Sequence, residues 1–181
     1  MPTVITHSIV AGTAAWGFNS GKETAKLWIL SLVCSSLPDA DVIGYRYLYI
    51  PYLHFFGHRG FFHSPFFALL LSILVVGIFY RKQVFFSVRW WRYVLFFSLL
   101  TASHGLLDAL TNGGNGIALL SPLTNARYFF PWTPIEVSPF SVRALLTHRG
   151  LAVISSEILW VWLPCFLAII LVRLYRKKAT A

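Results

Sequence analysis

Charged residues are scarce in this sequence, and acidic residues are scarcest. Only 12% of the 181 residues are charged, whereas soluble domains usually carry about a quarter. Asp and Glu number 6 against 15 Lys and Arg. Hydrophobic residues make up 57% of the chain, and the mean hydropathy is +0.67. This composition excludes an ordinary soluble domain and predicts an integral membrane protein.

Linkers, internal repeats and low-complexity tracts are also missing, so we expect one membrane-embedded domain over residues 1–181. The N-terminal stretch MPTVITHSIVAG has no basic residue before its apolar part, which argues against a cleaved signal peptide. Cys34 and Cys165 lie in apolar runs without a CxxC pattern. We expect both cysteines to be small packing residues.

The apolar runs predict an all-α, polytopic membrane protein. About five membrane-embedded helices are expected, over residues 5–18, 25–37, 65–80, 93–111 and 151–172. The first two runs are short enough to be partly re-entrant. Four of the nine prolines fall within residues 112–150, which predicts an irregular, lid-like extracytoplasmic loop.

Basic residues indicate the orientation, because short cytoplasmic loops are enriched in Lys and Arg. The predicted threading has an outward N-terminus and an inward C-terminus, as expected for a multi-pass protein of a bacterial inner membrane. No nucleic-acid partner is expected, since the cations are scattered over short loops without a recognition motif. The cytoplasmic residues are Lys22, Lys26, Arg81, Lys82, Arg89, Arg92, Arg173, Arg176, Lys177 and Lys178.

The same threading gathers histidines and acids on the opposite, periplasmic side. His104 and Asp108 are four residues apart and share one helical face. Imidazole nitrogen and carboxylate oxygen suit Zn, Mn or Fe. Ionisable groups within a membrane are costly, so those that occur there usually have a function. The candidate ligands of a divalent metal are His7, Asp39, His58, His63, His104, Asp108 and Glu157.

Each of these features has an ordinary explanation on its own. An HxxxD pair can be incidental, a DxD sequence can cap a helix, and an interfacial histidine can be a satisfied polar group. Glu157 could complete the metal shell or pair with a helix neighbour. The coincidence of five separate segments on one side favours a metal site.

A catalytic metal would lower the pKa of a bound water and stabilise charge on a phosphoryl oxygen. Asp41 could be a ligand, a partner that orients a ligand, or the general base. Arg59, between His58 and His63, and Arg127 in the loop could hold a substrate phosphate. Snorkelling of both arginines at the head-group level is the alternative.

Several segments together resemble the YdjM-like family of bacterial inner-membrane proteins, which are described as predicted metal-dependent hydrolases. They are His7, LPDADV at 37–42, GHRGFFHS at 57–64, SHGLLDALTNGG at 103–114 and SPLTNARYFFPWTPIEVSP at 121–139. The resemblance spans nearly the whole chain, and HRGxxHS is its most specific part. It implies hydrolysis and leaves the substrate open.

A more distant resemblance is to the all-helical zinc phospholipase C and nuclease P1 group. It depends on an N-terminal histidine, an aspartate, paired histidines and HxxxD. Those enzymes are soluble, bind metal with their mature N-terminal amine, and carry HxxxH and HxxxE pairs that this sequence lacks. Their three-zinc arrangement therefore does not carry over.

Other membrane enzymes are excluded by spacing. The chain has no HExxH, its pair is HxxxD rather than the HxxxxD of lipid acyltransferases, and its six histidines are too few for desaturase boxes. The family resemblance implies hydrolysis, and a site at head-group depth next to an apolar loop favours a substrate that arrives laterally, so we expect cleavage of a phosphoester or pyrophosphate bond in a lipid or lipid-linked substrate. A metal-ion or proton-coupled transporter is the main alternative, and a structural metal site is the third. The apolar loop YFFPWTP at 128–134 is expected to enter the outer leaflet or cover the site.

Overall fold

The computed structural model describes residues 1–18, 24–139 and 141–179, and this part of the chain is helical. It contains no strand; isolated bridges join Thr111 to Ile135 and Ile117 to Tyr128. The predicted all-α fold class is confirmed.

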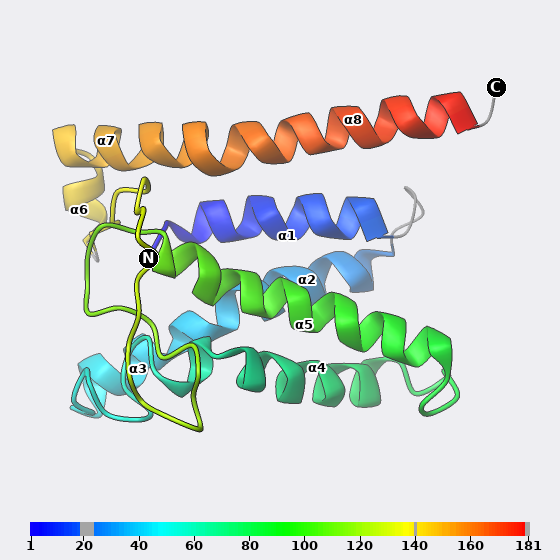
Figure 1. The fold of residues 1–181 in the computed structure, drawn as a ribbon, viewed down its shortest axis with the longest axis horizontal. Coiled ribbons are helices and arrows are strands. Elements are labelled where there is room, and N and C mark those ends of the chain that lie inside the picture. The colour runs from blue at the N-terminus through cyan, green and yellow to red at the C-terminus, as the bar shows by residue number, and fades with distance from the viewer. Residues whose placement is uncertain (19–23, 140, 180–181) are drawn as a thin grey trace.

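Long helices lie side by side and define two ends of the molecule (Figure 1). The N-terminus, α3, α6 and residues 110–139 gather at one end, which we call the loop end. The opposite end, which we call the basic end, holds the α4–α5 connection and the C-terminus. The long elements are α1 (Val4–Phe18), α2 (Ala25–Ser36), α4 (Pro65–Phe79), α5 (Val88–Ala109), α7 (His148–Glu157) and α8 (Leu163–Ala179).

Shorter elements extend or join these helices. The 3-10 turn η1 (Leu37–Ala40) and α3 (Asp41–Tyr47) continue α2 toward the loop end, and the 3-10 turn η2 (Phe61–His63) precedes α4. The π-helical turn η3 (Ile158–Trp162) joins α7 to α8, and α6 (Val142–Leu145) precedes α7.

Local sequence explains where three helices begin. Ser64 caps α4 by accepting a hydrogen bond from the Phe67 amide at 3.1 Å, and Pro65 occupies the first helical position. Ser87 caps α5 in the same way through the Trp90 amide at 3.2 Å. Thr24 caps α2 through the Leu27 amide at 3.3 Å. Each cap satisfies an N–H that would otherwise lack a partner.

The buried hydrophobic core lies between α1, α2, α4 and α5, which pack against one another. Trp90 and Phe97 are its largest fully buried aromatic side chains. The helix α8 packs on α1 but exposes most of its apolar side chains, Leu171 among them at 65%. Exposed apolar surface of this extent is expected where lipid is the solvent.

Within residues 1–18, 24–139 and 141–179, two helices are long and apolar enough to cross a membrane, Ala25–Tyr47 and His148–Lys178. The helices Val4–Phe18 and Pro65–Phe79 are apolar but shorter. The predicted helices therefore exist, whereas five complete crossings stay a prediction. The predicted irregular loop is present over residues 112–139, but helical structure resumes at α6 and α7, before the expected residue 151.

Candidate metal centre

Most of the predicted ligands come together at the loop end, from α1, η1, η2, α5 and the loop that carries His58. His63 of η2 can approach α5 closely because residue 105 is glycine. A Cβ atom at Gly105 would lie 2.3 Å from the His63 carbonyl oxygen, which real side chains do not tolerate. The glycine in SHGLLD therefore lets His63 lie beside His104 and Asp108.

Asp39, His63, His104 and Asp108 form the candidate metal centre. Each offers one ligand atom, and these atoms lie within 4.8 Å of one another. His104 Nε2 is 3.3 Å from Asp39 Oδ1, and His63 Nε2 is 3.6 Å from both Asp39 Oδ1 and Asp108 Oδ2. The side chain of Asp39 is 10% exposed, and the other three are fully buried.

Most polar atoms of this group have no hydrogen-bond partner among the described residues. They include both carboxylate oxygens of Asp39 and Asp108, both ring nitrogens of His63, and Nε2 of His104. A buried carboxylate without hydrogen bonds is costly, by several kcal/mol or more on an order-of-magnitude scale. A bound cation would remove that cost, so the donor set fits a divalent metal.

A hydrogen bond fixes the orientation of the His104 ring. Its Nδ1–H donates to the backbone carbonyl of Ser35 at 2.7 Å, which turns Nε2 toward Asp39 Oδ1 at 3.3 Å. Two electron-rich atoms in that arrangement repel unless a proton or a metal lies between them. The ring of His7 stacks on His104 with centroids 3.9 Å apart, and its Nε2 lies 3.7 Å from Asp108 Oδ1.

Asp41 differs from the other two aspartates because its oxygens have partners. Oδ1 accepts a hydrogen bond from His58 Nδ1 at 2.7 Å, and Oδ2 accepts one from the Arg59 amide at 3.0 Å. His63 Nδ1 lies 3.2 Å from the same Oδ2. Asp41, His58 and His63 also have ligand spacing, but this geometry fits best a carboxylate that orients two imidazoles.

His63 is the point at which the two groups meet. Burial opposes its charged form, but Asp39 and Asp41 outweigh burial and raise the pKa of His63 to about 9. A metal that binds His63 Nε2 must therefore displace a firmly held proton at neutral pH.

Arg59 is buried, with 1% exposure, so it does not snorkel to the head-group level. Its Nε lies 3.3 Å from Asp108 Oδ2, while Nη1 donates to the Gly113 carbonyl and Nη2 to Thr111 Oγ1. The backbone of Arg59 has φ 63°, a left-handed conformation that non-glycine residues seldom adopt. Such strain concentrates at functional sites.

Arg127 binds backbone rather than the candidate metal centre. Its Nη1 donates to the His58 carbonyl at 2.7 Å, and its Nη2 donates to the Tyr52 carbonyl at 2.8 Å. These contacts tie the long loop to the segment that carries His58.

Glu157 lies outside the two groups with ligand spacing. It pairs instead with polar groups of Thr3 and Thr6. Its carboxylate accepts hydrogen bonds from the Thr3 amide at 2.5 Å and from the hydroxyls of Thr3 and Thr6, each at 2.6 Å. Thr6 Oγ1 in turn accepts a hydrogen bond from Trp162 Nε1 at 2.7 Å, across the π-helical turn. Glu157 thus fastens the N-terminal segment to the last helix.

The N-terminal segment is the part of the site that sequence reasoning missed. Burial lowers the pKa of the Met1 amine to about 6, against the opposing effect of the Asp108 carboxylate. The amine therefore lies within electrostatic reach of the candidate metal centre. Only the early position of His7 hinted at this, and nothing in the sequence indicated Thr3 or Thr6.

Comparison with known proteins agrees with the family resemblance. The model of the YdjM inner membrane protein family matches residues 1–180. The chain is 40% identical over 164 residues to inner membrane protein YbcI of Escherichia coli (strain K12), covering 91% of this chain and 92% of that protein. No solved structure matches the chain.

Proposed function

Because the chain belongs to the YdjM inner membrane protein family, we propose that it is a membrane-bound, metal-dependent hydrolase. Its reaction is the cleavage of a phosphoester or pyrophosphate bond in a lipid or lipid-linked substrate at the periplasmic face. The observation that carries this proposal is the group of Asp39, His63, His104 and Asp108, whose carboxylate oxygens have no hydrogen-bond partner in the part of the chain that the structure describes.

The donor set supports a catalytic metal over a structural one. Mixed imidazole and carboxylate ligands suit Zn, with Mn and Fe as alternatives. Asp39, His63, His104 and Asp108 would hold it, and His7 beside Asp108 offers a further nitrogen. Structural zinc sites are closed by four ligands, so the additional donor favours a site with more than a structural role. When bound, such a metal lowers the pKa of water and stabilises charge on a phosphoryl oxygen.

The residues around the metal ligands have separate tasks. Asp41 orients the rings of His58 and His63. Arg59 places a guanidinium beside Asp108, where its remaining N–H donors can bind a phosphoryl oxygen. Arg127 acts indirectly, because its hydrogen bonds hold the backbone at His58.

A lipid substrate is supported by the surroundings of the site. The loop that closes this end exposes Phe129, Phe130 and Trp132, and the Trp132 ring packs against Trp160 with centroids 4.7 Å apart. Exposed aromatic residues of this kind sit well at a membrane interface. A substrate that arrives laterally from the outer leaflet would meet this surface first.

A transporter is less well supported. An ion path would need ionisable side chains that continue from the candidate metal centre toward the basic end. In the described residues, the helices between the two ends bury an apolar core that includes Val75, Val94 and Phe97. The buried charged and histidine side chains are His7, Asp41, His58, Arg59, His63, His104, Asp108 and Glu157.

The decisive test uses purified protein in detergent, where no transmembrane gradient exists. We expect bound divalent metal by elemental analysis and hydrolysis of phosphatidate or a polyprenyl pyrophosphate. Chelation should abolish turnover, and Zn or Mn should restore it. Protein that holds no metal and cleaves no ester, but moves ions in sealed vesicles, would overturn the proposal in favour of a carrier.

The periplasmic position of the site is tested separately by reporter fusions. A fusion after Lys178 should report the cytoplasm, and a fusion near Asn115 should report the periplasm, because basic residues flank the basic end. The opposite pair of results would place the candidate metal centre on the cytoplasmic side.

A further inference from the structure

An apolar pocket lies between η1–α3 and the start of α4, and its lining includes Asp41, which contacts His63 of the candidate metal centre. Its volume is about 540 Å³, within the range of roughly 300–1,000 Å³ typical of small-molecule sites. Its walls include Ile43, Leu48, Ile50, Phe56, Phe62 and Phe67.

The pocket and the candidate metal centre are built from the same short segments. Asp41 is the charged residue in the pocket lining, and its carboxylate is turned away from solvent onto His58 and His63. Phe62 precedes His63 in η2, while Leu37 and Ala40 flank Asp39 in and around η1. The pocket therefore shares with the candidate metal centre the segments that carry Asp39, Asp41 and His63.

The mouth of the pocket is lined by exposed apolar side chains. Ile43, Leu48 and Phe56 are 58%, 69% and 46% exposed. An apolar rim of this kind admits a hydrocarbon chain and disfavours water.

From this arrangement we infer that the pocket binds the hydrocarbon chain of the substrate while the anionic head group reaches the candidate metal centre. The inference depends on the proposed function and names its substrate class, an amphiphile with a phosphate head and an acyl or isoprenyl chain. The complementarity is chemical, since an apolar pocket adjoins a cluster that holds Arg59 and fits a divalent cation.

Two substitutions can fill the pocket without replacing a residue of the candidate metal centre. A Cβ atom at Gly44 would point at the flexible end of Ile50, 3.2 Å from its Cδ1, and leucine suits a helix better than glycine does. Gly44→Leu should therefore fold and occupy pocket space. Ala40→Leu adds bulk at a second point of the lining. The matched control is Ala168→Leu, at an exposed position of α8.

The test uses the full chain in phosphatidylcholine vesicles that contain phosphatidic acid with a diazirine in its acyl chain. After illumination, we expect crosslinks enriched in residues 37–67, several-fold weaker in Gly44→Leu and Ala40→Leu and unchanged in Ala168→Leu. Labelling spread evenly over α4 and α8, or unaffected by both pocket substitutions, would overturn the inference.

Crosslinking requires no turnover, so the two proposals can fail independently. Enriched labelling in a protein that hydrolyses nothing would support the lipid pocket and overturn the proposed hydrolase function. Hydrolysis without enriched labelling would support the hydrolase function and overturn the lipid pocket. If both hold, Gly44→Leu should reduce kcat/KM for dioleoyl phosphatidate several-fold more than for dihexanoyl phosphatidate, at unchanged metal content.

Discussion

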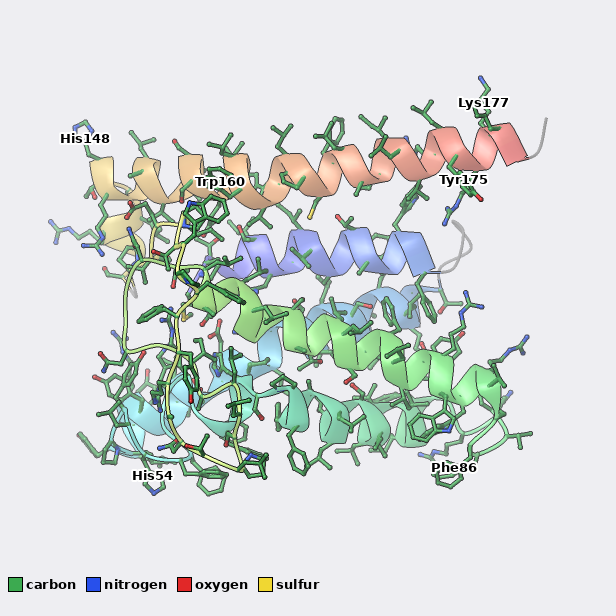
Figure 2. All side chains as sticks on the ribbon, in the orientation of Figure 1. His54, Phe86, His148, Trp160, Tyr175 and Lys177 are labelled. Carbon is green, nitrogen blue, oxygen red and sulfur yellow. The ribbon has the colours of Figure 1, made fainter. Side chains whose placement is uncertain are left out.

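The two ends of the helix bundle differ in whether their ionisable side chains are exposed or buried. At the basic end, Arg81, Lys82 and Arg89 are exposed, and Lys177 projects outward near the C-terminus (Figure 2). At the loop end, His63, His104 and Asp108 are buried. Exposed cations cost little and set the orientation of a membrane protein. Buried ionisable groups are costly, so the loop end needs a functional explanation that the basic end does not.

An apolar core separates the two ends. Leu27, Val76 and Phe97 are buried between them. Substitutions at one end should therefore not be felt at the other, because distant sites without shared partners act additively. The predictions below test that separation, from the largest expected effect to the smallest.

The largest effect is expected from Asp108→Asn. The substitution removes one negative ligand but preserves size, so the protein should fold, lose its bound metal and lose measurable turnover in detergent. Metal content by elemental analysis and phosphate release measure the two effects. Retention of both would show that Asp108 is not a ligand.

The next largest effect is expected from Arg59→Ala, which should keep the metal and reduce kcat/KM. Loss of one charge-stabilising donor commonly costs about 2.7–4 kcal/mol, or roughly 10²–10³ in rate. Arg59→Lys serves as the control, because it restores charge without the bidentate geometry and should recover part of the loss. Full activity in Arg59→Ala would reduce Arg59 to a structural partner of Asp108.

A smaller effect is expected from Asp41→Asn. Asp41 contacts His58 and His63, and loss of a partner that orients a metal ligand typically lowers metal affinity by about 10–100-fold. Titration against a chromophoric chelator measures the affinity. A complete loss of metal, as in Asp108→Asn, would identify Asp41 as a ligand instead.

The helices of the bundle were largely predictable from the sequence, because apolar runs and capping residues are local signals. The predicted helix 65–80 is observed as Pro65–Phe79, where Ser64 and Pro65 mark its start. The helix α5 begins at Val88, whereas the predicted run began at 93. The prediction started late because Arg and Trp in the first turns of α5 lower the hydropathy there. The helix α3 was missed because Asp41 and the tyrosines after it interrupt the apolar run.

The site was predictable only as far as local spacing reaches. The pair of His104 and Asp108 follows from helix periodicity, and both belong to the same group in the structure. The different roles of Asp39 and Asp41, which are two residues apart, depend on which side chains η2 brings near them. The hydrogen bond between Thr3 and Glu157 joins residues 154 positions apart, and no sequence pattern predicts it.

That long-range contact carries a stability prediction of its own. Glu157→Ala leaves the hydroxyls of Thr3 and Thr6 without their acceptor, so the free energy of unfolding should fall by about 1–3 kcal/mol. Thermal unfolding in detergent measures the loss. Thr6→Val in the same background should then cost only the hydrogen bond from Trp162 Nε1, since its hydrogen bond to Glu157 is already lost. An additive loss would contradict the shared network.

The smallest effect is expected at the basic end, from the double substitution of Lys82→Gln and Arg89→Gln. Both side chains are exposed, and surface substitutions away from special features change stability by about 0.5 kcal/mol or less. Metal content and turnover in detergent should equal those of the unsubstituted protein, and Arg81 and Arg92 should still hold the loop inside. A loss of metal comparable to that of Asp108→Asn would mean that the apolar core does not isolate the two ends. A carrier requires such coupling between the two ends of the bundle, whereas a hydrolase with its site at one end does not. This double variant therefore distinguishes a carrier from a hydrolase by a change at the basic end, where no chemistry is expected.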